Sequence, residues 1–589
     1  MRILDLTENG GPRMKRLGIA IICLLAFCNR PVFGGSAAAE TNSKDVLLST
    51  MQQELQRAQK ELGKLDPAPY FMSYAVHDQS VAMTVGSQGG MVNSMHTRTR
   101  SADVVVRVGS PSLDNTHEDN RPSGISSGTI PLADDADAIA HVLWQLTYSE
   151  YRKASQAYLR VKTATEVNAK EEDTSPDFSQ EPPEIHTDYN ELAPAPDQRV
   201  LEGMVRRYSA QLAKYSYVYR STVMVVAQRA RWHFVSTEGS RVVAPSAMVR
   251  LTIEAETQAD DGMELMRVET FQAESTDHLP GDTEIAARVD KMAADLKALR
   301  SAPLAEPYDG PALLSGRAAA VFFHEVLGHR LEGHRQRGEN EGQTFTKKLN
   351  EPVLPAFLSV IDDPTQRALN GVDLAGWYEY DDEGMPARRV EVIKDGVLKS
   401  FLMSRMPIKD IGKSNGHGRA QPGMMPTGRQ GNLIVISSRA TKGAELRQRL
   451  IEEVKKQGKP YGLYFEDIEG GFTLTQRALP QAFLVLPILV WRVHPDGRPD
   501  ELTRGVDIVG TPLAAISRIL LTGEKTEVFN GICGAESGSV PVSAAAPAML
   551  FSDIEVQKRA HSLSRPPILP PPGFEVGESK PTTRTGGPQ

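Results

Sequence analysis

The stretch AAAVFFHEVLGHRLEGHRQRGEN runs from Ala318 to Asn340 and begins with a strongly apolar segment. The apolar side chains around its first histidine are Val321, Phe322, Phe323, Val326 and Leu327. They predict a helix, within about residues 312–335, that is buried on most of its surface. Because buried imidazoles need polar partners, histidines on such a helix indicate a defined role rather than a solvated surface.

Two histidines in this stretch have an unusual spacing. His324, Glu325 and His329 form the pattern H-E-x-x-x-H, whereas the familiar zinc-peptidase helix has its histidines at i and i+4 on one face. On a regular helix an i, i+5 pair lies roughly 140° apart, too far to share one ion. We therefore expect a local distortion of the π-bulge type, and Gly328 is the position where it costs least.

Glu325 directly follows the first histidine, where it would reach a water molecule at a metal site. That is the position of a general base in metal-assisted hydrolysis. Two imidazoles leave a catalytic zinc one protein ligand short. Glu332 and His334 are the nearby candidates for this ligand, and Cys533 is the distant one. The alternative is a helix that carries a few surface histidines and binds no metal.

The composition limits the class of protein. The chain has 589 residues, of which 40% are hydrophobic and 24% charged, with a net charge of −8. These values are typical of a globular protein of several domains, and the negative charge argues against a nucleic-acid partner. No apolar run reaches the ~20 residues that a membrane span needs.

The N-terminus has the features of a secretory signal. Lys15 and Arg16 precede an apolar run from Leu17 to Cys28, and small residues follow up to Ala39. We expect residues 1–39 to be a signal peptide with its start at Met14. This predicts an exported protein, periplasmic or secreted.

Removal of that signal peptide would leave one cysteine. Cys23 and Cys28 lie within it, so the mature chain would retain only Cys533. A single thiol excludes an internal disulfide. The remaining roles are an inert buried residue, an intermolecular link, or a metal-binding or catalytic thiolate.

The rest of the chain divides into segments of different character. Residues 40–300 mix helical and β-like stretches and contain an acidic, Pro-containing insertion at 166–197, which we expect to be a surface loop. Residues 301–563 contain mainly hairpins. Residues 564–589 are Pro-rich and predicted to be disordered.

Five segments together resemble one family. HEVLGHRLEG is similar to the metal-binding helix of the TldD/PmbA zinc metalloproteases, in the TldD-type subunit that keeps the motif. The other segments are STEG (236–239), YDDEGMPARRVEVIKDGVLKSFLMSR (380–405), NGHGRAQPG (415–423) and FNGICGAESGSVPVSAAAPAMLF (529–551). The resemblance covers most of residues 300–555 well and residues 45–300 loosely.

The resemblance implies specific roles. His324, His329 and Cys533 would hold one Zn²⁺ per chain, and Glu325 would be the catalytic base. His334 stands where the family commonly has aspartate, so it is a further candidate for the metal shell. His417 and Arg419 are candidates for contacts with substrate or with its oxyanion.

The resemblance also implies an architecture and an activity. The expected fold is α+β, an α/β N-terminal domain followed by a β-rich C-terminal domain crossed by the H-E-x-x-x-H helix. The expected activity is hydrolysis of peptides or unfolded proteins, in a homodimer or a heterodimer with a PmbA-like paralogue. The alternative is a non-catalytic peptide-binding or partner subunit with a structural metal.

Overall fold

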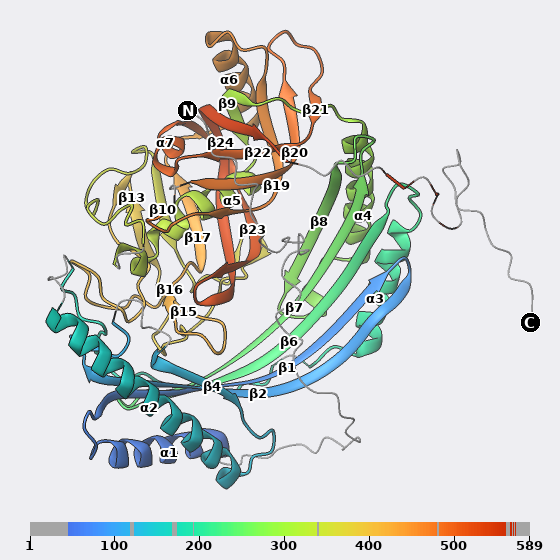
Figure 1. Cartoon of the computed structure of the whole chain (residues 1–589). Helices are drawn as coiled ribbons and strands as arrows, with labels where there is room; N and C mark the ends of the chain where they lie inside the picture. The colour runs from blue at the N-terminus through green and yellow to red at the C-terminus, as the bar shows by residue number, and fades with distance from the viewer. Residues whose placement is uncertain are drawn as a thin grey trace, which may run out of the picture. The chain divides into compact units, whose positions relative to one another are not determined.

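Two β-sheets organise the part of the chain that the structure describes (Figure 1). This computed structural model describes residues 45–117, 123–167, 173–192, 194–337, 341–479 and 482–560, with residues 566, 567, 569, 570 and 572. The predicted signal peptide (1–39) lies outside these residues, as does most of the predicted tail (564–589). Among the described helices, none has the length and apolar character needed to cross a membrane.

The first sheet contains eight strands within the described residues, in the order β3-β2-β1-β6-β7-β5, with β4 beside β2 and β8 beside β7. The strands are β1 (Pro69–Ser87), β2 (Gly90–Ser110), β3 (Leu113–Asp114), β4 (Ile125–Thr129), β5 (Ile185–Thr187), β6 (Arg220–Ser236), β7 (Arg241–Gln258) and β8 (Glu264–Ala273). Apart from β5 and β7, these neighbours are antiparallel. Apolar residues alternate along β1, β6 and β7, as a half-buried strand requires.

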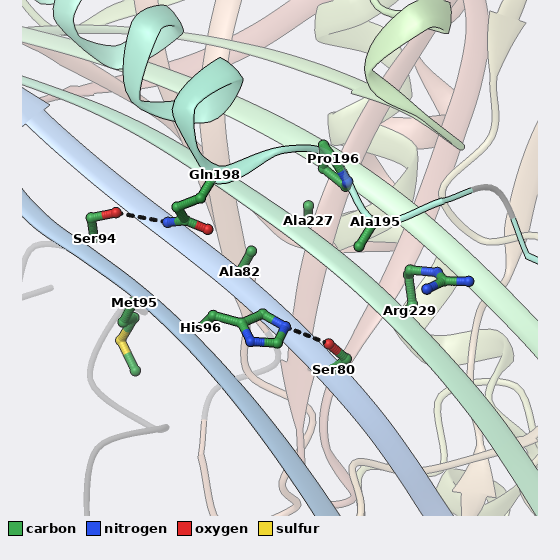
Figure 2. A pocket seen from close by; sticks show the side chains of 10 residues that line it. All are labelled: Ser80, Ala82, Ser94, Met95, His96, Ala195, Pro196, Gln198, Ala227 and Arg229. Carbon is green, nitrogen blue, oxygen red and sulfur yellow. Dashed lines mark hydrogen bonds between the residues drawn. The ribbon is translucent and has the colours of Figure 1, made fainter. Parts of the chain in front are cut away.

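Four helices pack on this sheet in two pairs. They are α1 (Val46–Leu62), α2 (Ala136–Val167), α3 (Gln198–Leu212) and α4 (Asp282–Ser301). α1 and α2 share a core with Tyr74 and Val76 of β1, whereas α3 and α4 share one with Ala82 farther along the same strand. Next to Ala82 a shallow pocket of about 380 Å³ remains, where Gln198 donates to Ser94 (Figure 2).

The second sheet contains twelve strands within the described residues. They are β9 (Tyr308–Leu314), β10 (Leu358–Asp362), β13 (Val390–Lys394), β14 (Val397–Leu398), β17 (Asn432–Ser437), β18 (Ala440–Thr441), β19 (Gly462–Thr473), β20 (Phe483–Val493), β21 (Glu501–Thr503), β22 (Val506–Gly510), β23 (Ile519–Ala535) and β24 (Gly538–Lys558). Two short ladders pair β11 (Ala368–Leu369) with β12 (Val372–Asp373) and β15 (Gly418–Arg419) with β16 (Thr427–Gly428). Helices α6 (Gly443–Lys456) and α7 (Pro512–Ser517) also belong to this half.

Part of the second sheet closes on itself. Strand β9 pairs with β19 on one side and with β24 on the other, so β24, β22, β20, β19 and β9 form a ring. Helix α5 (Gly316–Val326) packs against β24, β19 and β23 (Figure 1). Every residue of α5 except Arg317 is buried, which is why its sequence is apolar on all sides. The predicted α+β fold, with a helix crossing a β-rich C-terminal half, is therefore confirmed.

The predicted helix at 312–335 is shorter than expected. Residues 308–314 form β9 instead, because the ring needs a strand there, and α5 ends at Val326. The Asp-Gly turn at Asp395 and Gly396 is present between β13 and β14, with both residues at positive φ as such a turn requires.

The insertion at 166–197 is more than a surface loop. Asp177, Phe178 and Ser179 are buried. Arg337 donates to Asp177 at 2.7 Å, and Arg405 donates to the carbonyl of Ser179 at 2.6 Å. One acidic residue of this segment, Asp177, is thus the hydrogen-bond partner that the buried Arg337 requires.

A buried charge network anchors the first turn of α5. Asp467 of β19 accepts from Arg317 at 2.9 Å and from Arg267 of β8 at 2.5 Å. Arg267 is almost fully buried and also lies 3.3 Å from Asp295 of α4. One carboxylate therefore joins α5 to the N-terminal sheet.

We predict that Asp467→Ala lowers the free energy of unfolding by about 3 kcal/mol, because it leaves the buried Arg267 with a weaker set of partners. Denaturant unfolding followed by circular dichroism measures this. The exposed Arg199→Ala, next to Asp197, is the control and should change stability by less than about 0.5 kcal/mol. Equal effects of the two substitutions would contradict the anchoring role of Asp467.

Candidate metal centre

The end of α5 brings the two histidines together. Ser315 caps the helix by accepting a hydrogen bond from the Ala318 N–H at 3.0 Å. The helix stops at Val326, and a 3-10 turn, η3 (Gly328–Leu331), follows. The rings of His324 and His329 then lie with their centroids 4.9 Å apart. The expected distortion occurs at the expected place, but it is a helix end and a 3-10 turn rather than a π-bulge.

Gly328 is needed at this point for space rather than for backbone freedom. A Cβ atom there would lie 2.0 Å from Oε1 of Gln430. The Gln430 amide is itself buried, and neither of its polar atoms has a hydrogen-bond partner among the described residues. A larger residue before His329 would therefore require the end of the buried Gln430 side chain to move.

Cys533 comes to these histidines from a position 204 residues away from His329. It lies near the end of β23, close to the turn into β24. Its Sγ atom is 3.4 Å from Nε2 of His329, and ligand atoms of His324, His329 and Cys533 all lie within 4.8 Å of one another. All three side chains are buried.

The charges of these groups support one another. Burial alone would raise the pKa of the Cys533 thiol, but the imidazoles of His329 and His324 hold that pKa well below its usual value. Burial would lower the pKa of His329, but Cys533 and Glu332 raise it well above its usual value. Without a metal, the group therefore favours a thiolate beside protonated imidazole.

Glu332 orients His329 rather than joining the group of three. Both of its carboxylate oxygens lie 3.2 Å from Nδ1 of His329, on the opposite side of the ring from Cys533. Arg335 donates to the same carboxylate at 2.7 Å. Although burial raises the pKa of Glu332, His329 and Arg335 lower it to about 2. A carboxylate on the far nitrogen of a ligating histidine is the usual means of fixing that ring.

His334 lies in a different set of contacts. Its Nε2 forms an ion pair with Glu536, which also accepts from Arg335 at 2.9 Å. His334 and Glu536 group with Glu332 rather than with the three-ligand group. The structure therefore places Cys533 beside the two histidines. Glu332 contacts the far nitrogen of His329, and His334 pairs with Glu536.

Glu325 lies at the edge of the three-ligand group. Its Oε2 is 4.0 Å from Nε2 of His329. Burial raises the pKa of Glu325, although the adjacent His324 and His329 act to lower it. A Cβ atom at Gly471 of β19 would lie 2.8 Å from Cγ of Glu325, so glycine at that position leaves the room that this side chain occupies.

His417 and Arg419 have other partners. His417 is fully buried, with Nε2 at 3.3 Å from Asp362 and Nδ1 at 3.1 Å from the carbonyl of Asn415. Arg419 donates to the carbonyl of Gln430 at 2.7 Å. Their described hydrogen bonds hold the polypeptide around β15 and β16, and neither residue belongs to the three-ligand group.

The donor set fits a zinc ion. Bonds of about 2.3 Å to sulfur and about 2.1 Å to nitrogen, at tetrahedral angles, place the two donor atoms about 3.6 Å apart. The observed separation of Cys533 Sγ and His329 Nε2 is 3.4 Å. Two imidazoles and a thiolate are also ligands that zinc prefers. These residues are therefore suited to hold one zinc ion.

We predict that Cys533 of the metal-free protein is a thiolate at neutral pH, because its pKa is lowered well below the ordinary value of a thiol. The difference in thiolate absorbance between the wild type and Cys533→Ser should persist as the pH falls below 7. In His329→Ala, which removes the largest lowering influence, this absorbance should be lost at a higher pH. A wild-type transition near the ordinary pKa of about 8.5 would contradict the prediction.

The comparisons with known proteins agree with this geometry. Residues 307–558 match the model of the PmbA/TldA metallopeptidase C-terminal domain. A metalloprotease TldD homolog of Haemophilus influenzae is 28% identical over 250 residues, which is 42% of this chain and 48% of that protein. A zinc metalloprotease TldD homolog of Saccharolobus solfataricus is 25% identical, over 44% of this chain and 53% of that protein.

The chain thus spans about half the length of the curated relatives it matches. Among solved structures, TldE from Thermococcus kodakarensis matches with a TM-score of 0.56 and 12% identity, over 86% of this chain and 100% of that chain. At this identity the match establishes the fold alone. Residues 307–558 therefore resemble the C-terminal domain of the PmbA/TldA metallopeptidases, and the relatives that this chain matches carry the name metalloprotease.

Proposed function

We propose that this chain is a zinc metallopeptidase that hydrolyses peptides or unfolded proteins. The observation that carries the proposal is the meeting of His324, His329 and Cys533 within 4.8 Å, with the Glu325 carboxylate beside them. Three protein ligands and an adjacent general base are the composition of a catalytic zinc site, which keeps its fourth position open.

The proposed ligands have distinct roles. His324, His329 and Cys533 would hold the ion, with His329 fixed by Glu332 on its other nitrogen. The ion would supply Lewis acidity and lower the pKa of water toward 7. Because Cys533 already favours the thiolate, its sulfur is in the protonation state that binding requires.

Glu325 would act as general base and then as general acid. Its carboxylate removes a proton from the attacking water and later delivers that proton to the leaving amine. Burial, which raises the pKa of this carboxyl, brings it closer to the neutral range in which one group can do both. The absence of a side chain at Gly471 leaves the space that the Glu325 side chain occupies.

The alternative function is a partner subunit with a structural metal. A structural zinc has a closed shell of four protein ligands. Within the described residues the group at the end of α5 offers three, and Glu332 and His334 are held in other contacts. This arrangement favours the catalytic proposal.

Three further proposals concern assembly, export and substrate contacts. We propose assembly as a homodimer, or as a heterodimer with a PmbA-like paralogue, because residues 307–558 resemble the PmbA/TldA domain and the fold resembles that of TldE. Export rests on the residues around Lys15, Arg16 and Ala39. Contact of His417 or Arg419 with substrate stays a prediction.

We predict that Glu325→Gln keeps the zinc ion and loses hydrolysis by about 10²–10⁴-fold, since the amide cannot accept the proton. Cleavage of an unfolded protein with and without chelator measures the activity, and metal analysis measures the zinc. The matched control is Glu150→Gln, which changes a buried acid of α2 and should keep full activity. Normal cleavage by Glu325→Gln would show that the assignment of the base is wrong.

We also predict that Cys533→Ala loses most of the zinc that the wild type carries, about one ion per chain. Elemental analysis of protein purified without chelator gives the stoichiometry. Zinc retained by this variant would move the third ligand to Glu332 or His334. Zinc lost together with the folded state, as judged by circular dichroism, would favour the structural-metal alternative.

A further inference from the structure

Arg429 joins the two segments that carry the proposed metal ligands. Its side chain is fully buried. One terminal nitrogen donates to the carbonyl of Cys533 at 2.8 Å. The other donates to the hydroxyl of Ser537 at 2.8 Å and to the carbonyl of Gly538 at 3.0 Å, and Nε lies 3.4 Å from Oε1 of Glu332. One guanidinium thus spans the turn between β23 and β24 and the segment after α5.

We propose that Arg429 is a positioning residue of the metal centre, which sets Cys533 and His329 at the separation that one ion requires. It acts on Cys533 through the main-chain carbonyl and on His329 through Glu332. This inference rests on the proposed function, because it explains the separation of Cys533 and His329 by their binding of one metal ion.

The choice of arginine follows from the geometry. The group donates hydrogen bonds to three acceptors on one hairpin turn and, at the same time, forms an ion pair with a carboxylate on the other segment, to which its Nε makes no hydrogen bond. A guanidinium presents five N–H donors in a rigid plane and can do so, whereas an ammonium is a single point charge on a flexible stem.

Arg429 is itself held by the loop that the sequence motif NGHGRAQPG forms. Its main-chain N–H donates to the carbonyl of His417 at 2.9 Å. On the other side, Arg419 donates to the carbonyl of Gln430 at 2.7 Å. The two residues that sequence analysis selected as substrate contacts therefore fix the polypeptide on both sides of Arg429.

Arg405 provides a matched control. It is as buried as Arg429, but its side chain donates to the carbonyl of Ser179 and to Glu238. Removing it costs a buried charge and its partners without touching Cys533 or Glu332. Comparison of the two arginines separates the loss of a buried guanidinium in general from the loss of the link at the metal centre.

The first test is the affinity of the full chain for zinc, measured by competition with a chromophoric chelator. Arg429→Met should weaken zinc binding about 10–100-fold, the usual effect of removing a group that orients ligands. Arg405→Met should change it less than about threefold, and Arg429→Lys should lie between. In Co²⁺-substituted protein, Arg429→Met should also shift the sulfur-to-metal charge-transfer band, which a remote loss of stability does not move.

The second test needs no metal. Alkylation of Cys533 by iodoacetamide, followed at this residue by peptide mass spectrometry, reports how firmly the β23–β24 turn is held. Arg429→Met should speed alkylation of the metal-free protein at least about tenfold, and Arg405→Met should leave it near the wild-type rate. Glu332→Gln, which keeps the size of its side chain, should weaken zinc binding less when Arg429 is already replaced, because both act on His329.

The outcomes distinguish this inference from the proposed function. A wild type that binds no zinc would overturn the proposed function, while the alkylation rates would still decide whether Arg429 holds Cys533. Unchanged zinc affinity, unchanged Co²⁺ spectrum and unchanged alkylation in folded Arg429→Met would overturn the role of Arg429. If Arg429→Met does not fold, Arg429→Lys and Glu332→Gln decide by the same measurements.

Discussion

The complete burial of α5 is the constraint on which the rest of the structure depends. A short helix buried on nearly all sides can carry two histidines and a glutamate only at a cost, which partners inside the protein reduce. Helix α5 packs against β24, β19 and β23, and the β23–β24 turn brings Cys533 to the helix end. The proposed metal centre thus depends on two segments of the second sheet that meet at the end of α5.

At the buried end of α5, neighbouring side chains carry charges of opposite sign. The Cys533 thiolate lies beside His329, His329 beside the Glu332 carboxylate, and Glu332 between Arg335 and Arg429. Each buried charge has a neighbour of the opposite sign, which offsets the cost of removing it from water. The same contacts fix the ligand geometry, so stability and the proposed chemistry depend on one network.

The sequence predicted this centre in part, for identifiable physical reasons. The apolar run around His324 located the buried helix, and the i, i+5 spacing required a distortion near Gly328. Its form could not be predicted, because the helix ends where Gln430 approaches from a distant segment. Cys533 lies 204 residues from His329. The residues alone made it one of three candidate ligands, and the family resemblance selected it.

The roles of other residues around the proposed centre could not be predicted from the sequence. Glu332 was a candidate ligand, but in the structure its carboxylate contacts Nδ1 of His329, the ring nitrogen that faces away from Cys533. Arg429 and Gly471 belong to no motif, since their roles arise from contacts between strands that the sequence alone does not bring together. The NGHGRAQPG loop was singled out for contacts with substrate or its oxyanion, and its described contacts instead include Arg429, Gln430 and Asp362.

The most direct test of the account is X-ray absorption at the zinc edge of the full chain, purified without chelator. The account predicts one sulfur at about 2.3 Å and two imidazole nitrogens at about 2.0–2.1 Å around a single ion. A zinc shell without sulfur, or a chain that binds no zinc, would contradict the meeting of His324, His329 and Cys533 as a metal centre.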